Sequence, residues 1–191
     1  MTVAALIAQI RALRPKPDRL FIIAVSGYGG SGKSSLAAEL AKTLGEAEVV
    51  SVDDFIVGPK HQRSADWHTF DRERLRAEIL AVARPGETLN YQQLQSGVRA
   101  GHRPGRRRTI TPGTYLIIEG CSVLHPDLMK YYDFSVWIDC PLDTARLRAE
   151  TRDRSQGNDD SRLWDEVWSP NDRDYFDNYR PDRLADAIVE L

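Results

Sequence analysis

The sequence of 191 residues contains little cysteine, no long apolar run and almost no net charge. Its two cysteines, Cys121 and Cys140, are far apart and fit no metal-ligand spacing, so we expect buried, reduced thiols in a cytoplasmic protein. No apolar stretch approaches the ~20 residues of a membrane span. Residues 1–14 lack the order of basic, apolar and small-residue regions found in a signal peptide. The expected class is therefore neither a membrane-spanning protein nor a disulfide-rich secreted domain.

The balance of charge limits the expected partners as well. The chain has 26 Lys and Arg against 28 Asp and Glu, and the net charge of −2 predicts no general attraction to nucleic acid or to anionic membranes. Five arginines fall within residues 99–108 and could hold a phosphorylated substrate or touch RNA: Arg99, Arg103, Arg106, Arg107 and Arg108. Because no aromatic residues are interleaved with them, a solvated hairpin is favoured over a nucleic-acid groove.

Residues 27–34, Gly-Tyr-Gly-Gly-Ser-Gly-Lys-Ser, fit the phosphate-loop pattern G-x-x-x-x-G-K-[ST] at every defined position. An apolar run of strand type precedes them at 20–26, and a helical pattern follows at 35–44, which is the context that the motif requires. Glycines let backbone N–H groups turn toward phosphate oxygens, and the helix start favours the same anion. We expect nucleotide phosphates to bind at Gly27, Gly29, Gly30, Ser31, Gly32, Lys33, Ser34 and Ser35.

The same glycine-rich loop could be a chance turn or a dinucleotide site. A chance turn would not account for the flanking strand and helix. The spacing of Gly27, Gly29 and Gly32 also fits a dinucleotide fingerprint, with Asp53 about 20 residues further on. Lys33 followed by Ser34 argues against a dinucleotide, because a lysine at this point serves terminal phosphates, which a dinucleotide lacks. The phosphate loop is therefore favoured over both alternatives.

Two further apolar strands end in acids. Residues 48–52 lead into Asp53 and Asp54, and residues 114–118 lead into Glu119. Residues just past the carboxyl ends of parallel strands face the ligand crevice of an open α/β sheet. Asp53 could there orient or deprotonate an attacking hydroxyl, and Ser34, Asp53 and Glu119 could hold Mg²⁺. Asp54 is expected to cap a helix instead.

Apolar strands and amphipathic helices alternate along the chain. The pattern predicts an α/β fold of three layers, with a five-stranded, mainly parallel sheet, helices on both faces and a small lid. We expect a single phosphate-loop domain over residues 1–191, with an acceptor-pocket insertion at about 57–113 and a lid at about 150–165. The mixed polar and aromatic residues of 57–70 suit either an acceptor pocket or an ordinary surface loop. In the lid, Arg152 and Arg154 could close on transferring phosphate, while ion pairs along the helix surface are the competing interpretation.

From about residue 20 onward the chain resembles the uridine kinase and phosphoribulokinase family of small-molecule kinases. The resemblance rests on four features in order: the phosphate loop, the strand-end Asp53, the strand ending in Glu119 and Gly120, and the lid that opens at Arg152. The order and spacing of all four make the match specific, because the phosphate loop alone is shared by many families. The resemblance implies the substrate ATP and the ion Mg²⁺. It also implies catalytic roles for Lys33, Asp53 and Arg152.

The acceptor residues of the family are only partly matched. Uridine kinases have a Tyr-Asp-Phe group followed by a His, and of these residues the sequence keeps only Tyr91. Where the family has an acid before a Phe-Asp pair, this sequence has His68, with Asp66 nearby. The resemblance thus implies acceptor contacts from Asp53, Asp66, His68, Tyr91 and Glu119. It implies phosphoryl transfer to a hydroxyl, but uridine does not follow as the acceptor.

The sequence leaves the substrate and the class of action open. The acceptor could be a nucleoside such as uridine or cytidine, a sugar or amino sugar, or a vitamin-like alcohol. A different class is also compatible: a nucleotide-dependent switch or binding protein that hydrolyses ATP slowly and acts through a protein partner. The sequence does not decide between a monomer and a homo-oligomer.

Overall fold

The computed structural model describes the chain except residues 14–17, 58–60, 65–66, 68 and 96–102, and describes only the backbone of 95, 103 and 104. The elements in chain order are α1 Val3–Ala12, β1 Phe21–Ser26, α2 Lys33–Leu44, β2 Ala47–Ser51, η1 Val52–Phe55, α3 Arg72–Leu75, η2 Arg76–Leu80, β3 Leu89–Gln95, β4 Arg103–Ile110, β5 Tyr115–Glu119, α4 Pro126–Met129, β6 Phe134–Asp139, α5 Leu142–Ser155, α6 Ser161–Leu163, η3 Trp164–Trp168, α7 Ser169–Tyr179, α8 Pro181–Leu184 and β7 Ala187–Glu190.

Five strands form one parallel sheet in the order β2-β5-β1-β6-β7. Every residue of β1 and β5 is buried, which is typical of central parallel strands covered on both faces. The predicted α/β fold with a five-stranded parallel sheet is therefore confirmed. Because parallel strands present their carboxyl ends at one edge, the segments after β1, β2 and β5 meet there.

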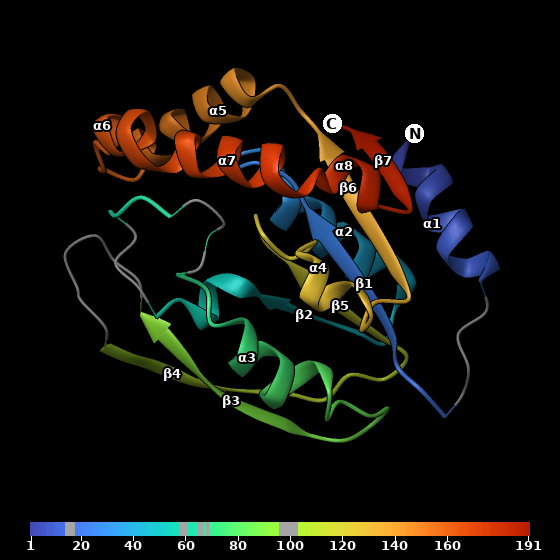
Figure 1. The fold of residues 1–191 in the computed structure, drawn as a ribbon. Coiled ribbons are helices and arrows are strands. Elements are labelled where there is room, and N and C mark those ends of the chain that lie inside the picture. Colours follow the sequence, from blue (N-terminus) through green and yellow to red (C-terminus); the bar gives the residue numbers. More distant parts are fainter. Residues whose placement is uncertain (14–17, 58–60, 65–66, 68, 96–102) are drawn as a thin grey trace.

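An apolar cluster fills each face of the sheet. On one face, side chains of α1 and α2, among them Leu6, Leu36 and Leu40, pack against β1, β5 and β6. On the other face, the sheet packs against η1, α3, the β3–β4 hairpin and Tyr175 of α7. Figure 1 shows α5, α6 and α7 across one end of the molecule, with α3 and the hairpin at the opposite end.

The predicted hairpin forms a separate two-stranded antiparallel sheet, β3–β4. Asp54 anchors it, accepting hydrogen bonds from Tyr91 Oη and Gln93 Nε2 at 2.9 Å each, with Arg108 at 3.5 Å. The expectation that Asp54 caps a helix is wrong, because Ser51 caps η1 and the Asp54 carboxylate lies among the donors of the hairpin. Arg108 also donates to the carbonyl of Val49 and so contributes to this anchor.

Three element boundaries differ from the sequence expectations. Helix α2 begins at Lys33, inside the phosphate loop, and not at Ser35. Residues 52–55, expected to end a strand, form a 3-10 turn that carries Asp53. The final strand, expected over residues 184–191, is only Ala187–Glu190, and Leu184 instead ends the helix α8, Pro181–Leu184.

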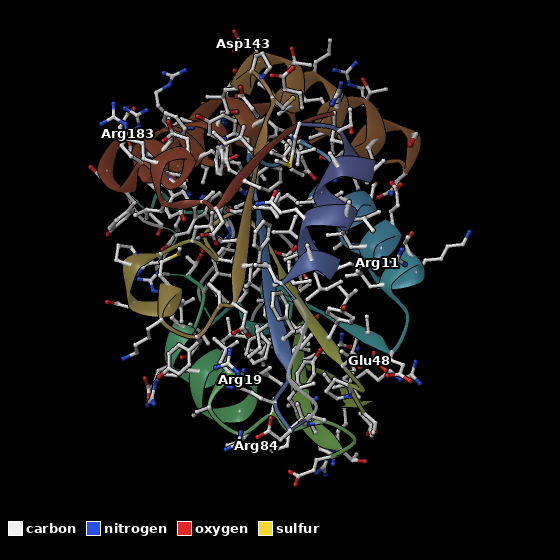
Figure 2. All side chains as sticks on the ribbon, turned by 90° about the vertical axis from the view of Figure 1, so that its right-hand side faces the viewer. Arg11, Arg19, Glu48, Arg84, Asp143 and Arg183 are labelled. Carbon is white, nitrogen blue, oxygen red and sulfur yellow. The ribbon has the colours of Figure 1, made fainter. Side chains whose placement is uncertain are left out.

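Charged side chains cover the outside of the domain. Figure 2 shows Arg11, Arg19, Glu48, Arg84, Asp143 and Arg183 at its periphery, with the sheet running through the middle. Both signs appear among them, as the near-zero net charge requires. Among the described residues, no helix has the length and apolar character needed to cross a membrane.

Candidate functional site

A cavity of about 1000 Å³ opens at the carboxyl ends of β1, β2 and β5. One wall is the phosphate loop with the start of α2, and a second comes from Asp53 and Glu119 after β2 and at the end of β5. A third wall is aromatic, and a fourth runs from α5 to Asp160. Distant parts of the chain therefore meet around one space, as expected of a ligand site in an open α/β fold.

The phosphate-loop side is suited to an anion. Helix α2 has twelve residues and no side-chain cap at Gly32, so its first N–H groups lack the usual capping partner. The Lys33 ammonium is buried beside them and donates to the carbonyl of Tyr28 at 2.8 Å. Burial would lower the pKa of Lys33, but Cys121, Asp172 and Glu119 beside it raise that pKa above its usual value. Lys33 therefore stays charged.

Two glycines of the loop are needed for close packing. A Cβ on Gly30, whose φ is +86°, would lie 2.1 Å from the carbonyl oxygen of Ala145, and one on Gly29 would lie 2.7 Å from the Trp164 ring. The loop is thus clamped between α5 and η3. The hydroxyl of Ser31 is buried in the loop without a hydrogen-bond partner in the described structure. Of the predicted phosphate ligands, only Gly27 and Ser31 do not line the cavity.

The three side chains predicted to hold Mg²⁺ all line the cavity. Ser34 Oγ donates to Glu119 Oε2 at 3.2 Å, and Asp53 reaches the same space from η1. Within the described part of the chain, no three His, Cys, Asp or Glu side chains form a metal cluster. One hydroxyl and separate carboxylates fit Mg²⁺ all the same, because this ion usually takes few protein oxygens and keeps water or phosphate ligands.

Another wall of the cavity is largely aromatic. Trp67 and Phe70, with ring centroids 5.7 Å apart, line the cavity together with Ile56 and Trp168. Tyr91 does not reach it, because its ring is buried against Phe55 and its hydroxyl is bonded to Asp54. The predicted acceptor residues Asp66 and His68 lie outside the described residues.

The predicted lid arginines differ in position. Arg152 lines the cavity and donates to Asp153 Oδ1 at 2.8 and 3.0 Å, while Arg154 is absent from the lining and donates to Glu150 at 2.9 Å. Both arginines therefore form the ion pairs of the competing interpretation, and only Arg152 also lines the cavity. Arg148, to which the sequence analysis assigned no role, also lines the cavity. Its spacing of four residues from Arg152 places both on one helix face and could have indicated this.

Asp172 of α7 was missed entirely by the sequence interpretation. Its side chain is 1% exposed and lines the cavity between the phosphate loop and the aromatic wall. Its Oδ2 accepts from the N–H of Gly29 at 2.7 Å, and its Oδ1 accepts from Trp67 Nε1 at 3.0 Å. No local pattern distinguishes it from the other acids of α7.

Comparisons with known proteins find relatives among small-molecule kinases. No family model matches the chain. Uridine kinase of Shewanella amazonensis is 30% identical over 146 residues, which are 69% of this chain and 68% of that protein. Human nicotinamide riboside kinase 1 is 28% identical over 142 residues, 70% of this chain and 66% of that protein. Yeast uridine kinase is 26% identical over 167 residues, 79% of this chain but only 33% of that protein, so much of its length has no counterpart here.

A solved structure covers nearly the whole chain. A protein from Silicibacter sp. TM1040, provisionally assigned as a fructose transport system kinase, superposes with a TM-score of 0.78 at 27% identity, over 99% of each chain. The likeness to the Shewanella enzyme extends over two thirds of both proteins and accompanies the phosphate loop and strand-end acids described above. On these grounds the chain belongs to the uridine kinase and phosphoribulokinase-like family of P-loop small-molecule kinases.

Proposed function

We propose that this chain transfers the γ-phosphoryl group of ATP to a hydroxyl group of a small molecule. The observation that carries the proposal is the cavity in which a phosphate loop, a strand-end carboxylate and an aromatic wall face one another. The family supports the use of ATP. Phosphoryl transfer needs positioning and charge stabilisation more than covalent help, and this cavity supplies groups for both.

The phosphate-loop residues would hold the nucleotide. The uncapped amides of α2 suit the phosphate oxygens, and the charged Lys33 is close enough to the loop to neutralise the terminal phosphates. Ser34, Glu119 and Asp53 would hold Mg²⁺, which supplies positive charge to the transferring group when it is bound. Arg152 would add charge from the α5 side.

Asp53 would orient the acceptor hydroxyl and take its proton. It is an exposed carboxylate on η1, and it lines the cavity between the phosphate side and the aromatic wall. A general base needs to be within hydrogen-bond reach of the proton that it removes. In this proposal the acceptor rests on Trp67 and Phe70 and presents its hydroxyl to Asp53 and to the nucleotide.

The aromatic wall limits the acceptor. Ile56, Trp67, Phe70 and Trp168 favour an alcohol that has a flat or apolar face, such as a nucleoside or a vitamin-like alcohol, and a sugar can also stack on such rings. In this proposal the chain is one kinase domain. Residues 57–113 contribute the acceptor side and residues 150–165 contribute the lid.

The proposal is tested by an acceptor screen. Purified protein, ATP and Mg²⁺ are mixed with a panel of nucleosides, sugars, amino sugars and vitamin precursors, and products are read by mass for the gain of one phosphoryl group. A product would establish the reaction and name the acceptor. No product across a broad panel, together with slow ATP hydrolysis that responds to a protein, would refute the proposal and favour a nucleotide-dependent switch.

A further inference from the structure

The carboxylate of Asp172 accepts hydrogen bonds both from the phosphate loop and from the aromatic wall, and no other carboxylate of the described residues is observed to do so. The two contacts use different oxygens, Oδ2 for the Gly29 N–H and Oδ1 for the Trp67 indole N–H. Gly29 and Trp67 are 38 positions apart in the sequence and belong to different walls of the cavity, which meet at Asp172. The carboxylate thus joins two walls that no described strand or helix connects directly.

Neighbouring contacts hold the same segment against α7. Asn171 is 1% exposed, and its Oδ1 accepts from the N–H of Ser64 at 2.7 Å and from Arg63 at 2.5 Å. Trp67 has a positive φ of 56°, an unfavourable conformation for a bulky residue that persists only when its surroundings enforce it. The first turns of α7 therefore fix both the backbone near Trp67 and the direction of its indole ring.

We propose that Asp172 is a positioning residue that couples the nucleotide side of the cavity to its acceptor wall. It holds the Gly29 amide in the phosphate loop and the Trp67 ring against the acceptor through one rigid carboxylate. The part of the proposal that concerns the acceptor rests on the proposed function. The part that concerns the nucleotide, called the nucleotide half below, rests on the phosphate loop alone. Asp172 is not assigned a part in the chemical step.

Both oxygens of the carboxylate are needed for this role. Asparagine in the same place offers one oxygen and one NH₂ group, so whichever way the amide turns, an N–H donor faces another N–H donor. Asp172→Asn must therefore give up either Gly29 or Trp67. Trp67→Phe keeps an aromatic ring and removes only the indole donor, which leaves the Gly29 contact in place.

The first experiment measures ADP affinity by calorimetry in the full chain. Asp172→Ala removes both acceptor oxygens and should weaken ADP binding at least about 10-fold, the effect of losing a hydrogen bond to a charged group. Trp67→Phe should stay within about 3-fold of the wild type, because the loop contact remains. Asp174→Ala is the matched control, since Asp174 lies on the same helix, pairs with Arg63 and does not line the cavity. Equal ADP affinity in the Asp172 and Asp174 variants would overturn the nucleotide half.

The second experiment tests coupling with the acceptor found by the screen. The KM for that acceptor should rise in Asp172→Ala and in Trp67→Phe. The double variant should have a KM close to that of the more impaired single variant, because both changes break the same link. Additive effects would overturn the coupling. The ADP measurements need no acceptor. They therefore test the positioning role of Asp172 even if the acceptor screen finds no product.

A third experiment needs no variant and covers the case in which Asp172→Ala does not fold. The N–H signals of Gly29 and of the Trp67 indole are followed by NMR as the pH is lowered. Burial raises the pKa of Asp172 to about 6, against the opposing effects of Lys33 and of the two N–H donors. Lys33 and Cys121, which also face this carboxyl, have raised pKa values, about 12 for Cys121, and do not titrate there. Both signals should shift with one shared midpoint. Different midpoints, or no shift in either signal, would overturn the proposal.

Discussion

Replacing Asp172 by asparagine should change how the stability of the fold depends on pH. Burial raises the pKa of this carboxyl from the usual 3.8 to about 6. Each pKa unit corresponds to about 1.4 kcal/mol. The free energy of unfolding is therefore about 3 kcal/mol lower when the Asp172 carboxyl is ionised than when it is protonated. The charge would thus be kept at a cost in stability, which is expected of a functional group and not of a structural one.

The sign follows from proton binding. Between pH 3.8 and about 6 the unfolded chain has released the proton and the folded chain retains it. Because the folded state binds more protons in this window, the free energy of unfolding falls as the pH rises. The contribution is fully present below pH 3.8 and is lost as the pH passes through about 6.

The assay compares denaturation of the wild type and of Asp172→Asn at a series of pH values. Asparagine does not titrate, so the difference between the two proteins removes the effect of all other groups. Between about pH 4.5 and about 7.5 the wild type should lose about 2 kcal/mol relative to the variant. For a domain of this size that is about 4–8 °C in Tm. A difference that stays constant with pH, or that favours the wild type as pH rises, would refute the reasoning.

Three further predictions concern the phosphate loop, the base and the lid. Lys33→Ala and Asp53→Asn should each lower turnover at least about 100-fold with the fold intact. Near-normal turnover in the second would remove Asp53 from the role of base. Arg152→Ala should lower kcat about 10-fold or more. Arg154→Ala loses the pair with Glu150 but no group that lines the cavity, so it should keep near-normal kcat. Gly30→Ala should lower Tm and abolish measurable ATP binding, because its new methyl group would collide with backbone.

The glycine prediction has a matched control. Gly157 has a similar φ of +80° but open space around its missing Cβ, whereas a Cβ on Gly30 would lie 2.1 Å from the carbonyl of Ala145. Gly157→Ala should therefore show only the backbone strain of about 1 kcal/mol. If both variants lost the same stability, close packing of the loop on α5 would not be the cause.

The parts of the fold that the sequence predicted are those with local signals. Strands β1 and β5 are continuous apolar runs, and the phosphate loop lies between a strand and a helix, so each could be recognised without knowledge of its neighbours. Glu119 and Asp53 were predicted at the cavity because parallel strands bring their carboxyl ends to one edge. Topology alone places these two acids beside Ser34.

The remaining site depends on contacts between distant residues. Asp172 meets Gly29 from 143 positions away, and nothing in the polar sequence around it indicates which acid of α7 turns inward. Tyr91 was expected to contact the acceptor, but the pairing of β3 with β4 and the carboxylate of Asp54 direct its hydroxyl into the core. Such contacts depend on how the hairpin and α7 pack onto the sheet, which local patterns do not encode.

Mutations in the two apolar clusters are expected to affect different sides of the cavity. The helix that follows the phosphate loop shares its cluster with α1 and the sheet, while Trp67 and Phe70 share theirs with η1, α3 and the hairpin. A change that reshapes the acceptor wall therefore also disturbs the packing of those elements and leaves the nucleotide-side cluster intact. A redesign of the acceptor preference would then need compensating substitutions around Phe55 and Leu75, and the helix behind the phosphate loop could keep its present residues.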